Sequence, residues 1–483
     1  MPVKSSITRV INFHPIGEDK KTYKKSLNFV KMYSTKNTNN KGETPMSSLA
    51  NLHLQSNTKI NFTGGNLSSD AGLLLLHKFI DKMGLHSLLK NCFKTTDKAN
   101  RQHLDHEILL QKIYQICAGY FSDDVSDELS IDPTLTTCLK KKRLASQPTI
   151  SRFGSRLDKK TLEQFHKIAC SLRKRVYSVI PPQRILLDLD STLLPTYGKQ
   201  DGEAFNYHYS AHGYHPLVCY DGLTGDLLKI ELRKGSTYSS TGVVQFLQPL
   251  FDEYLSQYPD TQLFLRGDSG FATPELYKQA ESNGCSYAIR LKDNRLLQES
   301  SFHLEEEVAA MAAIHPEKFI ALYGEFSYQA KSWDYSRRVI CKIEKRPGEL
   351  FIHHTFIVTN MELSPQELVK FYCNRGRMEN FIKESKNEFG FVTMSSHSML
   401  VNENRLQICM LAYNLFNWFR RLCLPGKMKA FRADTIRLKL LKIAGKVVKS
   451  ARNITFKLCS SCPYIREFYE TFTNIDWLTP KLE

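Results

Sequence analysis

The hydrophobic pattern of the first part of the chain is helical. Between Ser68 and about Lys174, apolar residues recur at the spacing of one helix face. One such run begins with four leucines at Leu73, and another follows Glu107, an acidic residue suited to a helix start. This periodicity predicts a helical region over residues 61–180.

After Pro182 the pattern changes to short apolar runs separated by turn residues, which is typical of strands. Longer periodic runs between them predict helices. The expected order is strand 184–190, strand 217–220, strand 227–232, helix 243–257, strand 262–266, helix 274–282 and strand 287–289. Three consecutive strands, a helix, and then strands that alternate with helices give the order of a ribonuclease H-like α/β core.

The remainder of the chain returns to strands and then to helices. Strand-like runs between 318 and 360 predict a β-rich insertion ahead of a helix that starts near Ser364. The apolar run 406–419, interrupted by three polar residues, predicts a buried helix that is too short to span a bilayer. Basic helices are expected over residues 420–457.

Positive charge is concentrated at the two ends of the sequence. The chain of 483 residues has 66 Lys and Arg against 49 Asp and Glu, a formal net charge of +17. Residues 1–60 carry +7 and residues 419–457 carry +11, so the rest is nearly neutral. This distribution indicates a polyanionic partner, most simply nucleic acid. We expect residues 1–60 to be a flexible basic extension, within which Met46 is a candidate natural start.

The cysteines and the N-terminal sequence bear on the compartment. Twelve cysteines are scattered singly, apart from Cys459 and Cys462, and no apolar secretory segment opens the chain. We therefore expect reduced thiols in the cytoplasm and no membrane association, with Cys459 and Cys462 as incidental thiols. His208, His212 and His215 invite a metal interpretation, but no fourth ligand stands near them in sequence.

Two aspartates stand where a phosphoryl-transfer site would need them. Asp190 ends one predicted strand and Asp268 follows another, and sites collect at strand ends in α/β cores. Divalent cations such as Mg²⁺ prefer oxygen ligands, and a two-metal site needs a third acid. Asp188 projects from the same strand face as Asp190 and is an alternative ligand. Taken alone, a strand-terminal aspartate is more often a cap or a turn residue.

A third acid lies in a stretch with a distinctive spacing. On a single helix at about 100° per residue, an arc of about 60° would carry four polar side chains. They are Tyr372, Arg375, Glu379 and Lys386. Lys383 widens this stripe slightly. The alternative interpretation is a solvated face with ion pairs one helical turn apart.

This spacing resembles the Y-R-E-K signature of DDE-type transposases of bacterial insertion sequences, in the group called transposase DDE domain group 1. Asp190-Ser191-Thr192 is similar to the first-acid motif of that family, and residues 266–271 are similar to the second. Five further stretches resemble one subgroup of the family: 69–75, 127–133, 144–147, 213–217 and 232–235. The resemblance extends from about residue 60 to the C-terminus.

The resemblance implies a DNA transposase that cleaves at the ends of its element and joins the freed 3′-OH to target DNA by two-metal phosphoryl transfer. It implies that Asp190, Asp268 and Glu379 form a catalytic, metal-binding triad for Mg²⁺, with Mn²⁺ as a possible substitute. The other signature residues would bind phosphates near the cut end, together with a neighbouring lysine: Tyr372, Arg375, Lys386 and Lys383.

The implied partners are double-stranded DNA and a second copy of the chain. The DNA comprises the terminal inverted repeats of the element and the target. The second copy would complete a homodimeric synaptic complex, at the bacterial nucleoid. The alternatives to an active transposase are a DNA-binding relic that recognises element ends without catalysis, and a ribonuclease H-fold nuclease that cuts without joining.

Further DNA contacts are predicted outside the signature. Residues 144–153 indicate a short helix that presents Thr149 and Arg152, either as a recognition helix or as an ordinary one with a proline in its first turn. Trp333 would either stack a flipped base, as family analogy suggests, or fill the core. The basic C-terminal residues would contact phosphates without sequence preference or form a solvated face: Lys439, Lys442, Lys446, Lys449 and Arg452.

The expected fold is therefore α/β, with a ribonuclease H-like catalytic core interrupted by a β-rich insertion and with helical N-terminal and C-terminal regions. The expected division is a basic extension at 1–60, a helical DNA-binding region at 61–180, the first part of the core at 181–300, the insertion at 301–362, a catalytic helix at 363–400 and a basic helical region at 401–483.

Overall fold

The structure is a computed structural model that describes residues 52–55, 58–97 and 101–482. The predicted extension at 1–60 lies almost entirely outside these residues. The chain divides into two units, residues 1–64 and 65–483. The first unit contains the antiparallel pair β1 (Leu52–Gln55) and β2 (Thr58–Ile60). The elements below belong to the second unit.

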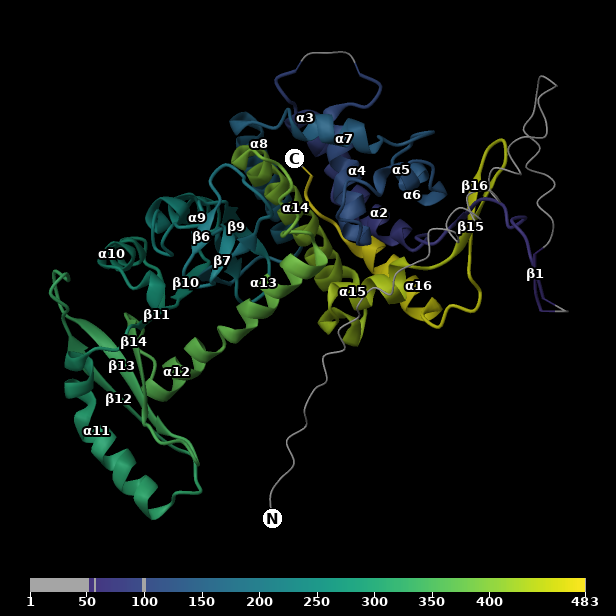
Figure 1. The fold of residues 1–483 in the computed structure, drawn as a ribbon. Coiled ribbons are helices and arrows are strands. Elements are labelled where there is room, and N and C mark those ends of the chain that lie inside the picture. Colours follow the sequence, from purple (N-terminus) through teal and green to yellow (C-terminus); the bar gives the residue numbers. More distant parts are fainter. Residues whose placement is uncertain (1–51, 56–57, 98–100, 483) are drawn as a thin grey trace, which may run out of the picture. The chain divides into compact units, whose positions relative to one another are not determined.

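Eight strands form the main sheet, in the order β12-β13-β14-β11-β10-β4-β8-β9 (Figure 1). The strand β10 runs parallel to both β4 and β11, and all other neighbours are antiparallel. The strands are β4 (Arg184–Ser191), β8 (Leu217–Asp221), β9 (Leu227–Glu231), β10 (Gln262–Gly267), β11 (Ser286–Leu291), β12 (Ile320–Tyr328), β13 (Arg337–Lys345) and β14 (His353–Thr359). The predicted α/β class is confirmed.

The helices between these strands also follow the predicted order. They are α9 (Val243–Gln257) and α10 (Pro274–Ser282). A short second sheet, in the order β5-β7-β6, lies between β4 and β8 in sequence. Its strands are β5 (Leu194–Pro195), β6 (Ala204–Asn206) and β7 (Ala211–Tyr214).

The predicted insertion is not separate from the core sheet. It begins with the helix α11 (Arg295–Ile314), which lies against β12 and β13 (Figure 1). The strand β14 pairs with β11, so that Ala288 lies opposite Thr359 and Leu291 opposite Phe356. The three strands of the insertion therefore continue the main sheet by regular hydrogen bonding.

The N-terminal part of the second unit is helical. Its helices are α2 (Leu73–Lys82), α3 (Leu85–Cys92), α4 (Asp105–Ala118), α5 (Ser126–Leu129), α6 (Pro133–Cys138), α7 (Gln147–Gly154) and α8 (Lys159–Val179). They share one hydrophobic core with the main sheet through α14 (Met399–Cys423), which contacts α4, α8 and β9.

Three buried polar residues of α14 bind backbone at one end of the main sheet. Asn414 accepts a hydrogen bond from the Leu227 amide and donates one to the Leu227 carbonyl, both at 2.8 Å. Gln407 donates to the carbonyl of Ile230 at 3.0 Å, and Asn417 donates to the carbonyl of Thr224 at 3.1 Å. The polar residues that interrupt the apolar run therefore satisfy backbone groups of β9 and of the turn before it.

The C-terminal region differs from the prediction of basic helices. After α14 the chain forms short turns and then a hairpin, followed by a final helix. These elements are η3 (Gly426–Ala430), α15 (Ala433–Ile436), η4 (Arg437–Leu441), β15 (Gly445–Lys449), β16 (Ile454–Leu458) and α16 (Ile465–Trp477). β15 also pairs with β3 (Leu67–Ser68). The two adjacent valines of β15 are β-branched and favour a strand over a helix.

Among the residues that the structure describes, no helix combines the length and the apolar character needed to cross a membrane. All twelve cysteines are free thiols in the structure, including Cys459 and Cys462.

Candidate active site

The two predicted aspartates meet at the same edge of the main sheet. β4 and β10 are parallel, and their register places Asp188 opposite Arg266. Asp190 and Asp268 each lie two residues further along these strands. Because parallel strands end at the same edge, the two carboxylates face a common space. The sheet register thus explains why residues so far apart in sequence come together.

Local hydrogen bonds fix both carboxylates. The amide of Ser191 donates to Oδ1 of Asp190 at 2.9 Å. Asp268 caps the short helical turn η2 (Ser269–Phe271), and its Oδ1 accepts from the amide of Gly270 at 2.8 Å. In each case one oxygen faces the backbone, and the other, Oδ2, points toward a shared cation.

That shared cation is the guanidinium of Arg375. Its Nη2 atom lies 3.0 Å from Oδ2 of Asp190 and 3.5 Å from Oδ2 of Asp268. The same nitrogen is 3.3 Å from the carbonyl oxygen of Leu189. Arg375 is mostly buried, with 16% of its side chain exposed. It therefore lies between the two acids and partly neutralises them.

The electrostatics of Asp190 reflect this position. Burial raises the pKa of its carboxyl to about 6, the Arg375 guanidinium opposes that rise, and the neighbouring Asp268 adds to it. Ionisation of this carboxyl therefore lowers the stability of the folded state. Such a raised pKa in an acid pair is typical of a functional site.

Asp188, the alternative metal ligand, has a structural role. It is fully buried, and its two oxygens accept hydrogen bonds from Nε and Nη2 of Arg266 at 2.6 and 2.5 Å. The Nη1 atom of Arg266 donates to the carbonyl of Phe371 at 2.6 Å. A Cβ on Gly222 would lie only 2.3 Å from Oδ2 of Asp188, so this close packing requires glycine. The geometry favours Asp190 over Asp188 as a ligand.

The signature residues do not lie on one helix as predicted. The helix α12 (Pro365–Cys373) ends before Arg375, and α13 (Gly376–Glu388) begins after it. Both linking residues, Asn374 and Arg375, keep right-handed helical angles, so the interruption is short. From this linking position, Arg375 contacts the two aspartates at the sheet edge. The sequence predicted instead that Arg375 would lie on the face of one regular helix.

Glu379, the predicted third acid, lies on the exposed first turn of α13. It does not form a close ligand cluster with Asp190 and Asp268. In the described parts of the chain, the only group of three or more potential ligand atoms within 4.8 Å of one another is on α2 and α3. The structure thus assembles two members of the predicted triad, and the role of Glu379 stays a prediction.

The acid pair affects the pKa values of two other signature residues. Burial raises the pKa of the Tyr372 phenol, on which Arg375 and Asp268 also act. Burial lowers the pKa of the Lys386 ammonium, and the carboxylate of Asp190 opposes that shift. Lys383 is exposed on α13. Tyr372 thus interacts electrostatically with Asp268, and Lys386 with Asp190.

The structure adds a tyrosine that the sequence did not single out. The Tyr209 hydroxyl donates to the carbonyl of Ser191 at 3.2 Å. Burial raises the pKa of this phenol, and both Asp190 and Asp268 raise it further. No motif marked this residue in advance, because it lies in the turn between β6 and β7 and reaches the site only through the tertiary fold.

The neighbouring histidines do not form a metal cluster in the described structure. His208 packs its ring edge against Tyr209 at 4.7 Å between centroids. His212 lies 2.9 Å from Glu203, and Nδ1 of His215 lies 2.7 Å from the carbonyl of Thr237.

An arginine of one family-like motif organises the loop beside Asp190. Arg233 donates from Nη1 to the carbonyls of Tyr238, Ser239 and Thr241, at 3.2, 3.0 and 2.8 Å. The Ser239 hydroxyl lies 2.9 Å from that of Ser191. Residues 232–235 are one of the stretches that resemble the transposase family. Only the structure shows that Arg233 binds the backbone of the loop that contains Ser239.

The predicted contacts of the helical region lie on α7. Arg152 is exposed, and Thr149 is partly buried. Both line a pocket of about 460 Å³ together with Arg101, His103 and Arg156. Asp97 lines the same pocket and forms an ion pair with Arg101, so the positive charge of the lining is partly compensated, and the predicted DNA contact of Thr149 and Arg152 stays a prediction.

Trp333 occupies a core position and not an exposed one. Its residue exposure is 6%, and its ring packs edge-on against Tyr277 and Tyr328 at 5.4 and 5.5 Å. The Arg337 guanidinium lies 5.4 Å from its centre. In this arrangement the indole is not available to stack a flipped base. Trp333 is therefore a core residue, and the alternative prediction of base stacking is corrected.

The five basic C-terminal candidates separate into two sets. Lys442 forms an ion pair with buried Asp70 at 2.6 Å, and Lys439 binds the Tyr464 hydroxyl. Both lysines are partly exposed but paired within the protein, so they are less available to DNA than the sequence predicted. The other three are exposed on the hairpin of β15 and β16 or its turn: Lys446, Lys449 and Arg452.

Comparison with known protein families identifies the family of this chain. Residues 51–480 match the family described as transposase DDE domain group 1. The chain therefore belongs to this family, and it is a DDE-type transposase whose substrate is DNA.

One solved structure that the comparison matches to this chain is a piggyBac transposase synaptic complex with hairpin DNA. The likeness has a TM-score of 0.40 and 10% sequence identity, and it covers 85% of this chain and 86% of that one. A likeness of this size assigns no role to any residue here. No curated protein matches the chain.

Proposed function

We propose that this transposase cleaves DNA at the ends of an insertion sequence and joins the resulting 3′-OH to target DNA. The observation that carries the proposal is the pairing of Asp190 and Asp268 across one guanidinium at a shared sheet edge. Acid pairs of this kind suit phosphoryl transfer, because their carboxylates can hold the metal ions that neutralise charge during the reaction.

The core strands support this proposal. β4, β8 and β9 form a consecutive antiparallel series, and β10 and β11 continue the sheet in parallel on the other side of β4. We assign this arrangement to a ribonuclease H-like core, with Asp190 on its central first strand. The order of strands and helices along the chain gives the same assignment.

The donor set fits divalent metal ions. Asp190 and Asp268 offer carboxylate oxygens, which are the ligands that Mg²⁺ and Mn²⁺ prefer. The guanidinium of Arg375 lies beside the Oδ2 atoms of both aspartates, so Asp190 and Asp268 together bind a positive charge at the sheet edge. Asp190 and Asp268 would hold the metal, with Glu379 as the third acid. Bound Mg²⁺ would supply charge neutralisation and activation of the attacking oxygen.

The protein residues have separate tasks in this proposal. Arg375 orients the two carboxylates through its contacts with both and with the Leu189 carbonyl. Tyr372, Lys383 and Lys386 would bind phosphates at the cut end. The exposed hairpin and the pocket beside α7 would bind flanking duplex, and a second copy of the chain would hold the other element end.

The test is a cleavage and joining assay on labelled duplexes that carry the element ends, with and without Mg²⁺. The proposal predicts Mg²⁺-dependent nicking and joined products with the wild-type chain, and neither with Asp190→Asn. Cleavage without joining would instead indicate a nuclease, and binding alone would indicate a relic that recognises ends. Either outcome would contradict the proposed function.

A further inference from the structure

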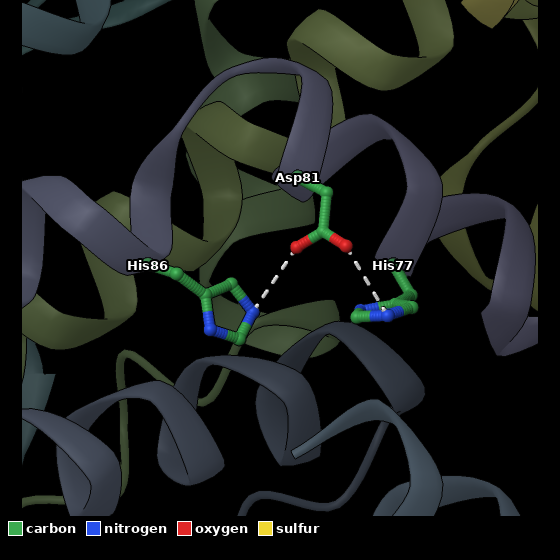
Figure 2. Close-up of side chains that lie close together, drawn as sticks. All are labelled: His77, Asp81 and His86. Atoms are coloured by element: carbon green, nitrogen blue, oxygen red, sulfur yellow. Dashed lines mark ion pairs between the residues drawn. The ribbon is translucent and has the colours of Figure 1, made fainter. Parts of the chain in front are cut away.

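The N-terminal helical region contains a cluster of two imidazoles and one carboxylate that the proposed DNA chemistry does not use (Figure 2). His77 and Asp81 lie one turn apart on α2, and His86 is the second residue of α3. The Nε2 atoms of His77 and His86 each lie 3.3 Å from a different oxygen of Asp81. Within residues 52–55, 58–97 and 101–482, no other group of His, Cys, Asp or Glu brings three ligand atoms within 4.8 Å of one another.

The turn between α2 and α3 brings the cluster together. A spacing of four residues places His77 and Asp81 on one face of α2. Gly84 then reverses the chain with a φ of +64°, a conformation that favours glycine. A Cβ at this position would also lie 3.0 Å from Nη1 of Arg175. The tight turn carries His86 back to the carboxylate of Asp81.

We propose that His77, Asp81 and His86 form a zinc-binding site, with water as the fourth ligand. Zinc bonds of about 2.0–2.1 Å in a tetrahedron place neighbouring ligand atoms about 3.3–3.4 Å apart. The two separations of 3.3 Å join the imidazole nitrogens to different oxygens of Asp81, so each nitrogen lies about one ligand spacing from the carboxylate. Imidazole nitrogen with one carboxylate is a donor set that suits zinc better than Mg²⁺.

The charges around the two imidazoles bear on cation binding. Burial lowers the pKa of His77 and of His86, against the opposing effect of Asp81. Lys140 lowers both pKa values further, and a neighbouring histidine adds to this effect in each case. The positive charge of Lys140 also opposes a bound cation, so the affinity depends on Asp81 as the compensating anion.

Neighbouring groups complete the site. The Nδ1 atom of His77 lies 2.7 Å from the hydroxyl of Tyr114, a buried residue of α4. A hydrogen bond from Nδ1 to this hydroxyl leaves Nε2 of His77 free for the metal, as in many zinc sites. The Nε2 atom of His86 is buried and makes no hydrogen bond, so coordination would satisfy it.

Water can reach the site from one side. His86 also lines a pocket of about 430 Å³, together with His103, His106 and Glu107. A bound ion would join α2 to α3 directly and would contact α4 through Tyr114. It would therefore act as a brace within the helical region, separate from the acids of the main sheet.

The experiment measures zinc in the purified full chain after removal of metals and addition of one equivalent of zinc. We expect close to one zinc per wild-type chain by elemental analysis, and at least a tenfold loss of affinity in His77→Ala and His86→Gln. The matched control is His103→Ala, a histidine of the same pocket that is outside the cluster, and it should bind as the wild type does. Asp190→Asn should also retain zinc, because the site does not involve the main sheet.

Two further readouts keep the proposal independent of misfolding. Cobalt(II) in place of zinc should give the visible absorption of a four-coordinate site in the wild type and not in folded His86→Gln. Zinc should raise the melting temperature of the wild type and leave that of His86→Gln unchanged. The proposal is overturned if the folded wild type binds no zinc at micromolar concentrations, or if His86→Gln retains the ion. Loss of zinc in Asp190→Asn would also overturn it, by placing the ion at the aspartate pair.

Discussion

Arg375 and Asp190 are joined by a contact of 3.0 Å between Nη2 and Oδ2, and the same nitrogen reaches Asp268. This relationship changes the role expected of the arginine. The sequence predicts a fork that grips a phosphate, whereas the structure directs one of its nitrogens to the acid pair and the Leu189 carbonyl. Arg375 thus contacts both carboxylates in the structure without DNA.

Arg375→Lys should reduce cleavage at least ~10-fold, which is about 1.4 kcal/mol of transition-state stabilisation. A lysine keeps the charge but cannot contact both aspartates and a carbonyl with the planar geometry of a guanidinium. The measurement is the single-turnover cleavage rate at saturating Mg²⁺, with Arg377→Lys on the exposed start of α13 as the matched control. Wild-type rates in Arg375→Lys would show that its geometry is not needed.

Replacing each proposed acid should abolish cleavage and leave DNA binding nearly intact. The variants are Asp190→Asn, Asp268→Asn and Glu379→Gln, and binding is measured on element-end duplexes by a mobility-shift assay. Removing negative charge should, if anything, strengthen binding to phosphates. Normal turnover by Glu379→Gln would show that Glu379 is not the third acid. This variant is the most informative of the three, because Glu379 is exposed.

Asp188→Ala should destabilise the fold by about 3–5 kcal/mol, because it leaves the buried guanidinium of Arg266 without its carboxylate. Urea unfolding measures this change. Asp190→Ala, two residues along the same strand, should cost far less stability. Equal losses from the two substitutions would contradict the division between a structural and a functional aspartate.

Asp190→Asn should stabilise the metal-free protein at pH 8 but not at pH 4. The pKa of Asp190 is raised by burial to about 6, from an ordinary value of 3.8. The stability that the protonated carboxyl contributes is therefore complete below about pH 4 and is lost as the pH rises through about 6. At about 1.36 kcal/mol per pKa unit, the gain at pH 8 is at most about 3 kcal/mol.

The measurement is the melting temperature of both proteins in a chelator between pH 4 and pH 8. The exposed Asp260→Asn serves as the control for a change of net charge. A difference between Asp190→Asn and wild type that does not grow with pH would contradict the raised pKa.

Replacing Lys446, Lys449 and Arg452 with alanine together should weaken binding to all duplex sequences alike. The slope of log K against log salt should fall by roughly 0.9 for each phosphate that the variant no longer neutralises. Lys442→Ala is the contrasting variant, because its ion pair with buried Asp70 predicts a loss of stability in place of a change in salt slope. An unchanged slope in the triple variant would show that the hairpin does not touch DNA.

The elements of the core could be predicted because their signals are local. Apolar runs, turns and caps mark each strand from β4 to β11 in the main sheet, and the two aspartates lie at strand ends. The short interruption at Asn374 and Arg375 was not predicted, although Asn374 and Gly376 have low helix propensity, and the contacts of Arg375 with distant strands could not be predicted at all. Helical periodicity alone cannot register such a tertiary contact.

The same limit applies to charge. Lys442 and Lys446 are alike in sequence, but one lies on buried Asp70 and the other is exposed. Which of them is available to DNA depends on a residue at the far end of the sequence. Likewise, the amides of Gln407, Asn414 and Asn417 read as interruptions of an apolar helix until their backbone partners near β9 are known.

The pairing of β14 with β11 has a consequence for the evolution and engineering of this chain. A segment that is hydrogen-bonded to the sheet cannot be removed as an independent module. Deleting β12 to β14 would leave β11, which is mostly apolar, as an unprotected edge with open backbone donors and acceptors. Shortened variants would then tend to associate through that edge, so length changes are better tolerated at the tip of the β13–β14 turn, around exposed Leu350.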